Sequence, residues 1–264
     1  MIVFLNINLN NKGQNCKLVK NLVIADIQGN LKAFEAVLED AMIKSGFDMI
    51  WFLGDITGCG SEPENCIDLL LAHNHIAVAG DQDLAVTEKI ETDGYGQPAI
   101  DIFDWTKTQI TNSQKNYLEN LPLTLEHNSF TLTHGTPRQP IKEVFHPMYM
   151  PIEALHDTFL YFRTPYCAVG ASRTPLICTE SGPTFIKFPE EELYNLTKKT
   201  RIVLNPGSVG QPRDGDPRAS YMIYDDVDET VTRRRTNYDI EATQRKMRNA
   251  GVDEILVARL EYGR

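Results

Sequence analysis

Five short polar segments each follow a run of apolar residues, and they carry side chains that bind metal ions or move protons. They span residues 26–30, 54–55, 80–83, 134–135 and 170–173. The first four contain the carboxylates Asp26, Asp55, Asp81 and Asp83 and the imidazole of His134. Carboxylates gathered closely repel one another, and their pKa values rise unless a cation neutralises them. Oxygen and imidazole donors suit Mn, Fe, Zn or Mg, so the pattern predicts a divalent metal site.

Strands that alternate with helices must bring these segments together. Apolar runs at 22–25, 48–53 and 75–79 are typical of buried strands, while residues 31–42 and 63–72 have apolar side chains at helical spacing. Further strands are predicted at 130–133, 166–169 and 201–204, with a hairpin at 220–231, a helical stretch at 99–121 and a terminal helix from Ile240. This order predicts an α/β fold, in which ligands bind at the carboxyl ends of the strands.

The N-terminus has a different pattern. Residues 2–9 and 16–20 flank an Asn- and Gly-rich break, which predicts a hairpin extension over residues 1–21. The remaining residues, 22–264, are predicted to form a single domain. An exposed edge strand at 2–9 can pair with a second chain, so a homo-oligomer formed through this hairpin is a possible assembly.

Charge and composition exclude several classes of protein. The chain has 26 Lys and Arg against 36 Asp and Glu, a formal net charge of −10. A field of this sign repels nucleic acids and anionic lipids, so we expect neither as a partner. The five cysteines form no CxxC pair, and no signal peptide or membrane span is evident, which favours a cytoplasmic protein.

The polar segments together resemble the calcineurin-like metallophosphoesterase superfamily, in particular its small bacterial and archaeal phosphodiesterase branch. Typical members read D-x-H-G-N, G-D-x-x-G-x-G, G-N-H-D, H-G and G-H-T-H; this chain reads DIQGN, GDITGCG, GDQD, HG and GASR. A block NPGSVGQPRDGDPRA at 205–219 matches that branch almost letter for letter. The resemblance implies a four-layer αββα sandwich with a small cap insertion at about 85–125. It also implies phosphoester hydrolysis at two metal ions.

The ligand set implied by the resemblance is incomplete in this chain. The positions for the first ion are Asp26, Gln28, Asp55 and Arg173, and those for the second are Asp55, Asp81, His134 and Ala171. A glutamine is a weak neutral ligand, and an arginine cannot bind a metal because it stays protonated. We therefore expect Arg173 to pair with Asp26 and Asp55 in place of the first ion. At most one divalent ion is expected, at Asp55, Asp81 and His134 with Asp26 nearby.

The proton donor of the family is also replaced. Gln82 stands at the position of the catalytic histidine, and Asp83, the usual orienting partner, remains. A glutamine donates a hydrogen bond but no proton, and general acid catalysis contributes roughly 10²–10⁴-fold to a rate. The candidate catalytic residues are Gln82, Asp83 and Arg173, and the candidate binding residues for a small phosphorylated ligand are Arg173, Asn30 and Gly135.

Three functions follow from this comparison. The favoured one is a degenerate phosphoesterase that binds a phosphate- or nucleotide-like ligand with weak or absent hydrolysis. The second is an active single-metal phosphodiesterase or phosphatase in which Arg173 clamps the phosphate. The third is a non-catalytic scaffold or regulatory protein.

Two groups of arginines have simpler interpretations. Arg213 and Arg218 can contact a phosphate, but pairing with Asp214 and Asp216 is the favoured interpretation. The run 233–235 consists of three arginines in a predicted strand, and we expect it to be a solvated face.

Overall fold

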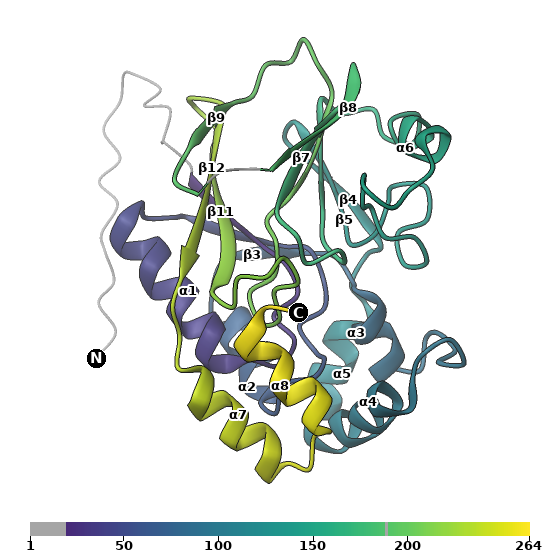
Figure 1. Ribbon diagram of the computed structural model, residues 1–264, viewed down its shortest axis with the longest axis vertical. Coiled ribbons are helices and arrows are strands. Elements are labelled where there is room, and N and C mark those ends of the chain that lie inside the picture. Colours follow the sequence, from purple (N-terminus) through teal and green to yellow (C-terminus); the bar gives the residue numbers. More distant parts are fainter. Residues whose placement is uncertain (1–19, 188–189) are drawn as a thin grey trace.

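A computed structural model describes residues 20–187 and 190–264 (Figure 1). The hairpin predicted over residues 1–21 lies outside the described residues, except for Lys20 and Asn21, which begin strand β1. The oligomer predicted to form through that hairpin therefore stays a prediction.

Twelve strands within the described residues form two six-stranded sheets. The first sheet has the order β3-β2-β1-β11-β12-β9, and the second has the order β4-β5-β6-β10-β7-β8. The first consists of β3 (His75–Ala77), β2 (Met49–Phe52), β1 (Lys20–Ile24), β11 (Ala219–Asp225), β12 (Thr230–Thr236) and β9 (Leu193–Asn195). The second consists of β4 (Thr124–His127), β5 (Phe130–Thr133), β6 (Tyr166–Val169), β10 (Ile202–Asn205), β7 (Leu176–Thr179) and β8 (Gly182–Lys187). In each sheet three neighbouring strands are parallel, β1–β2–β3 in the first and β5–β6–β10 in the second.

The two sheets pack face to face because their strands are apolar on both faces. Along β1, Leu22 and Ile24 pack in the cluster with helix α1, whereas Val23 packs in the cluster shared with the second sheet. This is the alternation that a strand buried on both faces requires. Between the sheets, the ring centroids of Trp51 and Phe130 are 5.1 Å apart.

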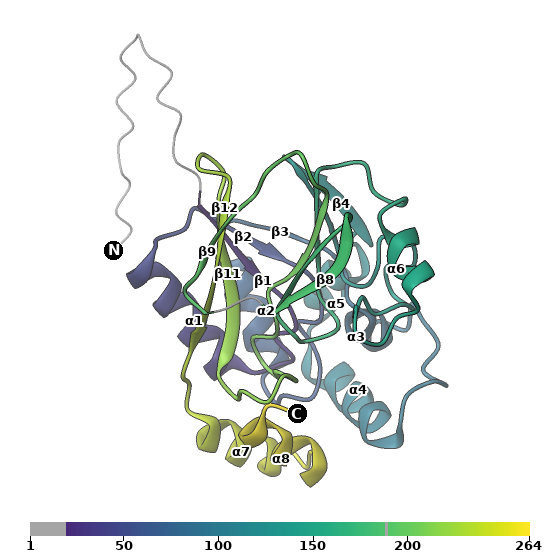
Figure 2. The ribbon, with the colours of Figure 1, turned by 45° about the horizontal axis from the view of Figure 1, so that its top comes forward.

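Helices cover the outer faces. Helix α1 (Leu31–Lys44) and helix α2 (Pro63–Leu71) pack against the first sheet, and α6 (Ile152–Thr158) packs against the second. The order of layers, with α1 and α6 on opposite sides of the sheets, is visible in Figures 1 and 2. The predicted four-layer α/β sandwich is confirmed.

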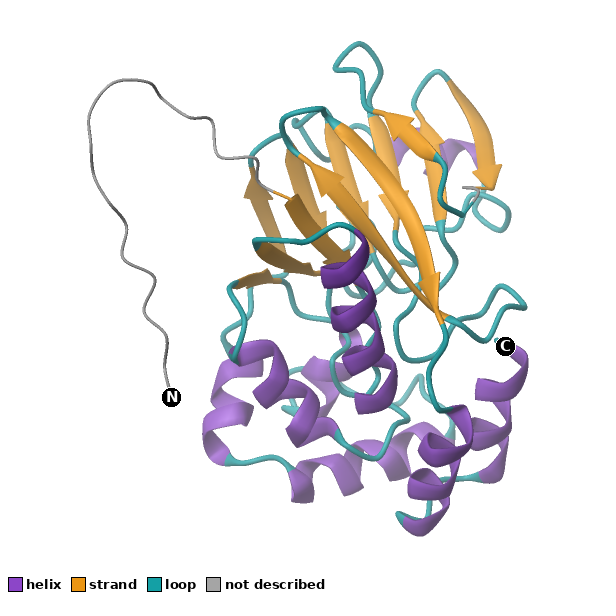
Figure 3. Cartoon of the chain, turned by 90° about the vertical axis from the view of Figure 1, so that its left-hand side faces the viewer, coloured by secondary structure: helices purple, strands orange, loops and turns teal. Residues whose placement is uncertain are grey.

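A third group of helices lies at the carboxyl ends of the parallel strands, below the sheets in Figure 3. It contains α3 (Asp81–Val86), α4 (Gln97–Gln109), α5 (Asn112–Glu119), α7 (Ile240–Asn249) and α8 (Glu254–Tyr262). One apolar cluster joins Phe103 of α4 to Met247 and Val257 of the C-terminal helices. The predicted cap insertion therefore packs against the C-terminus, which forms two helices rather than one. None of the helices in the described ranges is long and apolar enough to cross a bilayer.

The interpretation of the arginine run as a solvated face is wrong for two of its three residues. Arg233 and Arg235 are only 7% and 4% exposed. Arg235 pairs with Asp214 and donates to the backbone oxygens of Asp216 and Arg218. These contacts compensate for the burial of the Arg235 charge, whereas Nε of Arg233 is buried without a hydrogen-bond partner among the described residues.

Arg213 and Arg218 are predicted to pair with neighbouring aspartates, and this prediction is confirmed for Arg218 only. Arg218 binds the carboxylate of Asp216, with Nη2 2.7 Å from Oδ2. Arg213 has no ion pair with any carboxylate in the described part of the chain, because its neighbour Asp214 is bound to Arg235.

Candidate functional site

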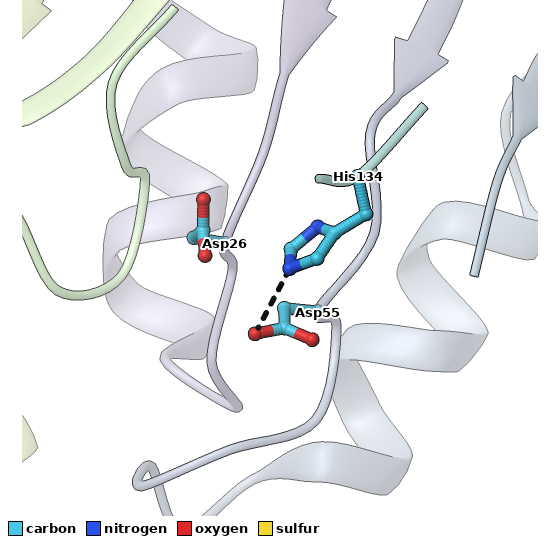
Figure 4. Close-up of side chains that lie close together, drawn as sticks. All are labelled: Asp26, Asp55 and His134. Atoms are coloured by element: carbon cyan, nitrogen blue, oxygen red, sulfur yellow. Dashed lines mark ion pairs between the residues drawn. The ribbon is translucent and has the colours of Figure 1, made fainter. Parts of the chain in front are cut away.

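The ends of strands from both sheets bring the predicted polar segments together. Asp26 follows β1, Asp55 follows β2 and His134 follows β5, and all three side chains are almost fully buried. One ligand atom from each lies within 4.8 Å of the other two. Figure 4 shows the two carboxylates and the imidazole turned toward a common point.

The backbone at this point is strained. Asp26, Gln28, Asp55, Ala171 and Arg173 all have φ between 53° and 62°, and they are five of nine non-glycine residues with positive φ in the described chain. Such conformations cost of order 1–3 kcal/mol each and cluster at functional sites. The loops therefore hold these positions in place against a local preference for other conformations.

His134 presents one ring nitrogen to the carboxylates. Its Nδ1 donates to the carbonyl oxygen of Leu53 at 2.6 Å, which leaves Nε2 3.1 Å from Asp81 Oδ1 and 3.6 Å from Asp55 Oδ2. A backbone carbonyl that fixes the other nitrogen is the usual support of a metal-binding histidine.

The charges in the cluster are strongly coupled. Burial raises the pKa of Asp55 well above its usual value, and the neighbouring Asp81 raises it further. Burial by itself lowers the pKa of His134, but the carboxylates of Asp55 and Asp81 bring it well above its usual value. The cluster therefore holds a proton unless another cation neutralises it.

Two glutamines hold the carboxylate of Asp55. Gln28 Nε2 donates to Asp55 Oδ2 at 2.9 Å, and Gln82 Nε2 donates to the same oxygen at 2.5 Å. The backbone N–H of Gln82 donates to Oδ1 at 3.0 Å. The two glutamines that stand at family histidine positions thus lie in the site as hydrogen-bond donors.

Arg173 lies against two carboxylates, as its sequence position predicts. Its Nε is 3.3 Å from Asp26 Oδ1, and its Nη2 is 3.8 Å from Asp55 Oδ2. Its Nη1 donates to Gln211 Oε1. Burial lowers the pKa of this guanidinium, but Asp26 and Asp55 more than offset that effect. Arg173 therefore supplies a fixed positive charge beside the cluster.

Asp81 stands at the edge of the cluster and is held by a residue that the sequence analysis did not find. Its Oδ1 faces His134, and its Oδ2 accepts a hydrogen bond from the hydroxyl of Tyr95. Burial by itself raises the pKa of Asp81, but the hydrogen bonds from His134 and Tyr95 bring it below its usual value. Tyr95 lies between α3 and α4 and is flanked by two glycines, Gly94 and Gly96, and that flexible context is the one local signal of a special position.

Asp83 orients the backbone of the site. Its carboxylate accepts hydrogen bonds from the N–H groups of Asp55, Gly80 and Thr57 at 2.8–3.1 Å. The sequence interpretation makes Asp83 the partner of the side chain at position 82, whereas in the structure it fixes the loop that carries Asp55. Its neighbour Asp81, predicted to lie in a loop, forms with Gln82 and Asp83 the first turn of α3.

Asn30 and Gly135 lie next to the site, and their polar groups make contacts within the protein. Asn30 caps α1 by accepting from Ala33 N at 3.2 Å, and it donates to Gly210 O at 2.9 Å. The N–H of Gly135 donates to Pro140 O at 2.6 Å. Their role in ligand binding stays a prediction.

The donor set fits a divalent metal ion. Asp26 Oδ2 is buried and has no hydrogen-bond partner within the described chain, although it belongs to the cluster. Two carboxylates and one imidazole suit a transition metal with open positions. The three residues whose ligand atoms lie close together are Asp26, Asp55 and His134, and Asp81 is hydrogen-bonded to the imidazole. The sequence analysis instead predicts Asp81 as a metal ligand and Asp26 as a residue near the ion. Ala171 supplies no ligand.

A cavity of about 290 Å³ opens onto this cluster. Asp55, Asp81, Gln82 and Arg173 line it, so a ligand in the cavity reaches the carboxylates and the guanidinium together. The site therefore combines a potential metal position with a fixed cation, which is an arrangement suited to a phosphoryl group.

Comparisons with known proteins agree with this geometry. The family profile described as calcineurin-like phosphoesterase matches residues 19–176. The uncharacterized protein MJ0912 of Methanocaldococcus jannaschii is 35% identical over 254 residues, covering 94% of this chain and all of that protein.

Two solved structures have the same fold. A metallophosphoesterase from Sphaerobacter thermophilus is 37% identical, with a TM-score of 0.84 over 94% of this chain and all of that one. The hypothetical protein PH1004 from Pyrococcus horikoshii is 20% identical, with a TM-score of 0.74 over 94% of this chain and 99% of that one. The family match, the whole-length relatives and the cluster of Asp26, Asp55 and His134 lead to one conclusion, that this chain belongs to the calcineurin-like phosphoesterase family.

Proposed function

We propose that this phosphoesterase binds a small phosphorylated ligand with at most one divalent metal ion, and that its hydrolytic activity is weak or absent. The observation that carries the proposal is the guanidinium of Arg173 between Asp26 and Asp55, in a cavity that also exposes Asp81 and Gln82. The metal is Mn, Fe, Zn or Mg.

Charge balance supports a single ion. The carboxylates of Asp26, Asp55 and Asp81 carry three negative charges, and Arg173 already supplies one positive charge. One divalent ion brings the positive charge to three, which matches the carboxylates while His134 stays neutral as a ligand. A second divalent ion would add two further positive charges to a site that Arg173, Arg213 and Arg259 already line, and that is costly.

Asp26, Asp55 and His134 would hold the ion, with Asp81 as a further ligand. A bound divalent ion supplies Lewis-acid polarisation and lowers the pKa of water. Arg173 would bind oxygens of the phosphoryl group, because a guanidinium fork matches their geometry.

The amide of Gln82 is the reason to expect slow hydrolysis. When water attacks phosphorus, the phosphorus–oxygen bond to the leaving group breaks and the leaving oxygen takes up a proton. Gln82 can donate a hydrogen bond to that oxygen but has no proton to transfer. Without a general acid the rate falls by roughly 10²–10⁴-fold.

The second candidate function is an active single-metal phosphodiesterase or phosphatase in which Arg173 clamps the phosphate. The contact of Arg173 with the cavity favours it, since the fixed cation faces the position where negative charge develops during the reaction. This candidate shares the ligand and the metal with the first and differs only in rate.

The test is the metal content of the purified full-length protein, measured by elemental mass spectrometry after loading with Mn²⁺ or Zn²⁺ and desalting. We expect about one ion per chain, lost in Asp55→Ala and retained in Glu241→Gln, which changes an exposed carboxylate on α7. Two ions per chain contradicts the proposal. No ion would agree with the upper limit of one but would contradict the assignment of Asp26, Asp55 and His134 as metal ligands, and would leave Arg173 as the cation of the cluster.

Hydrolysis of a dinucleoside monophosphate, whose alkoxide leaving group needs a proton, by the metal-loaded protein then separates the two candidates. We expect a rate close to that of the Asp55→Ala variant. A metal-dependent rate well above that of the variant supports the active single-metal enzyme instead.

A further inference from the structure

Three arginines line the cavity that opens onto the site. Arg173 follows β6, Arg213 lies in the loop before β11, and Arg259 lies on α8. They are far apart in the sequence, and the packing of α8 against the cap brings the last of them to the site. The proposed function uses Arg173 alone.

The other two arginines have no negative partner. Arg173 pairs with Asp26 and Asp55, but neither Arg213 nor Arg259 forms an ion pair with a carboxylate in the parts of the chain that are described. Arg213 Nη2 lies 3.5 Å from Gln211 Oε1, the neutral oxygen that also accepts from Arg173. Two guanidinium groups thus meet at one uncharged acceptor.

The carboxylates of the site offset the positive charge of Arg213 only in part, since Asp26 raises the pKa of this guanidinium less than its other neighbours lower it. The nearby cation of Arg173, followed by burial and by Arg259, lowers the pKa of Arg213 to about 10. Like charges held together in this way are stabilised by an anion between them.

Gln211 adds an unsatisfied donor to the same wall. Its side chain is only 1% exposed, and its Nε2 has no hydrogen-bond partner among the described residues. A buried amide N–H without an acceptor costs about 1–3 kcal/mol. An oxygen of a bound ligand would satisfy it.

We infer that Arg213, Arg259 and the Gln211 amide bind a second phosphoryl group, adjacent to the one held at Arg173 and Asp55, so that the ligand of this site is a diphosphate. This inference rests on the proposed function, which places the first phosphoryl group. Arg173 links the two positions, because it contacts Asp26 on one side and Gln211 on the other.

The size and the remaining wall of the cavity agree with a diphosphate ester. The two phosphoryl groups of a diphosphate share one bridging oxygen, so both fit within about 290 Å³. The apolar side chains of Ile102, Val144 and Leu256 also line the cavity. They provide a surface for the organic part of an ester. Inorganic phosphate at the first position would contact neither these apolar side chains nor Arg213 and Arg259.

The inference is tested by calorimetric titration of the full-length protein, loaded with Mn²⁺ and then desalted, with inorganic phosphate and with inorganic diphosphate. No further metal is added during the titration, so that the diphosphate meets no free ions. We expect diphosphate to bind at least about tenfold more tightly than phosphate. Arg213→Gln and Arg259→Gln should each reduce diphosphate affinity by at least about tenfold, because each removes charge-assisted hydrogen bonds, and should leave phosphate affinity within about twofold.

Arg245→Gln is the matched control, since this arginine lies on α7, is 63% exposed and pairs with Glu241 away from the cavity. It should change neither affinity. Equal binding of the two probes by the native protein, or an equal loss of both in the variants, overturns the second phosphoryl position but leaves the proposed function standing. Failure to bind either probe overturns both, and the metal content then shows independently whether the metal position survives.

Discussion

At the scale of single residues, the carboxylates of the site contact amide and guanidinium groups of the chain itself. Gln28 and Gln82 donate to the carboxylate of Asp55, and Arg173 places its charge against Asp26. A histidine at these positions would offer a lone pair to a metal, whereas an amide N–H or a guanidinium offers a proton to a carboxylate oxygen. We therefore expect these loops to bind fewer metal ions, with the glutamines and Arg173 holding the carboxylates of Asp55 and Asp26.

Restoring the histidines should restore the second ion. We expect the variant that combines Gln28→His, Gln82→His, Ala171→His and Arg173→His to raise the metal content from about one ion to about two per chain, measured by elemental mass spectrometry. Gln82→His alone is the control and should leave about one, because position 82 serves proton transfer rather than ligation in the family resemblance. If the fourfold variant binds no more metal than the native protein, the assignment of these loops to ligand positions is wrong.

At the scale of elements, close contacts between loops hold the site in shape. The loop after β10 lies against the loop after β1, where Gly210 N donates to Asp26 O at 2.9 Å and Gly210 O accepts from Asn30. A Cβ on Gly210 would come within 1.9 Å of the carbonyl oxygen of Ile27. Backbone contacts from the segment 205–219 thus fix the position of the loop that carries Asp26.

Gly210→Ala should therefore destabilise the protein. We expect a loss of about 1–3 kcal/mol in the free energy of unfolding, because the added methyl group must push two loop backbones apart. Urea denaturation followed by circular dichroism measures it. The control is Gly94→Ala, where a Cβ would meet nothing within 4 Å, and its stability should stay within about 0.5 kcal/mol of the native value. Equal stabilities of the two variants would show that the loop relaxes without cost.

At the scale of the whole molecule, the site lies where the two sheets and the helical group meet. Asp26 and Asp55 follow strands of the first sheet, His134 and Arg173 follow strands of the second, and Arg259 comes from α8. A ligand that joins these parts binds the folded chain and not the unfolded one, so binding should stabilise the entire fold.

Metal binding should raise the melting temperature. At a free metal concentration one hundred times the Kd, the expected stabilisation is about 2.7 kcal/mol, or about 5–10 °C for a chain of this size. The shift should shrink as the pH falls, because protons on His134 and Asp55, whose pKa values are raised, compete with the ion. Scanning calorimetry with Mn²⁺ measures the shift, and a chelator should reverse it. An equal shift in Asp55→Ala would place the ion elsewhere.

The sequence by itself determined the layered fold and the loops of the site. The apolar runs that predict β1, β2 and β6 are continuous, because a strand covered on both faces has no solvated side. The order of strand, polar loop and helix then places Asp26, Asp55 and His134 at strand ends, where they meet. These are local patterns, and local patterns can be read along the chain.

The tertiary structure alone decided which charged side chains form ion pairs and which line the cavity. Because Arg235 is buried against Asp214, Arg213 has no ion pair with a carboxylate within residues 20–187 and 190–264, although Asp214 is its neighbour in sequence. The contacts of Tyr95 with Asp81 and of Arg259 with the cavity join residues from separate elements, and no spacing rule relates them. The physical reason is that an ion pair or a binding wall depends on distance in space, which packing between layers sets after the local elements have formed.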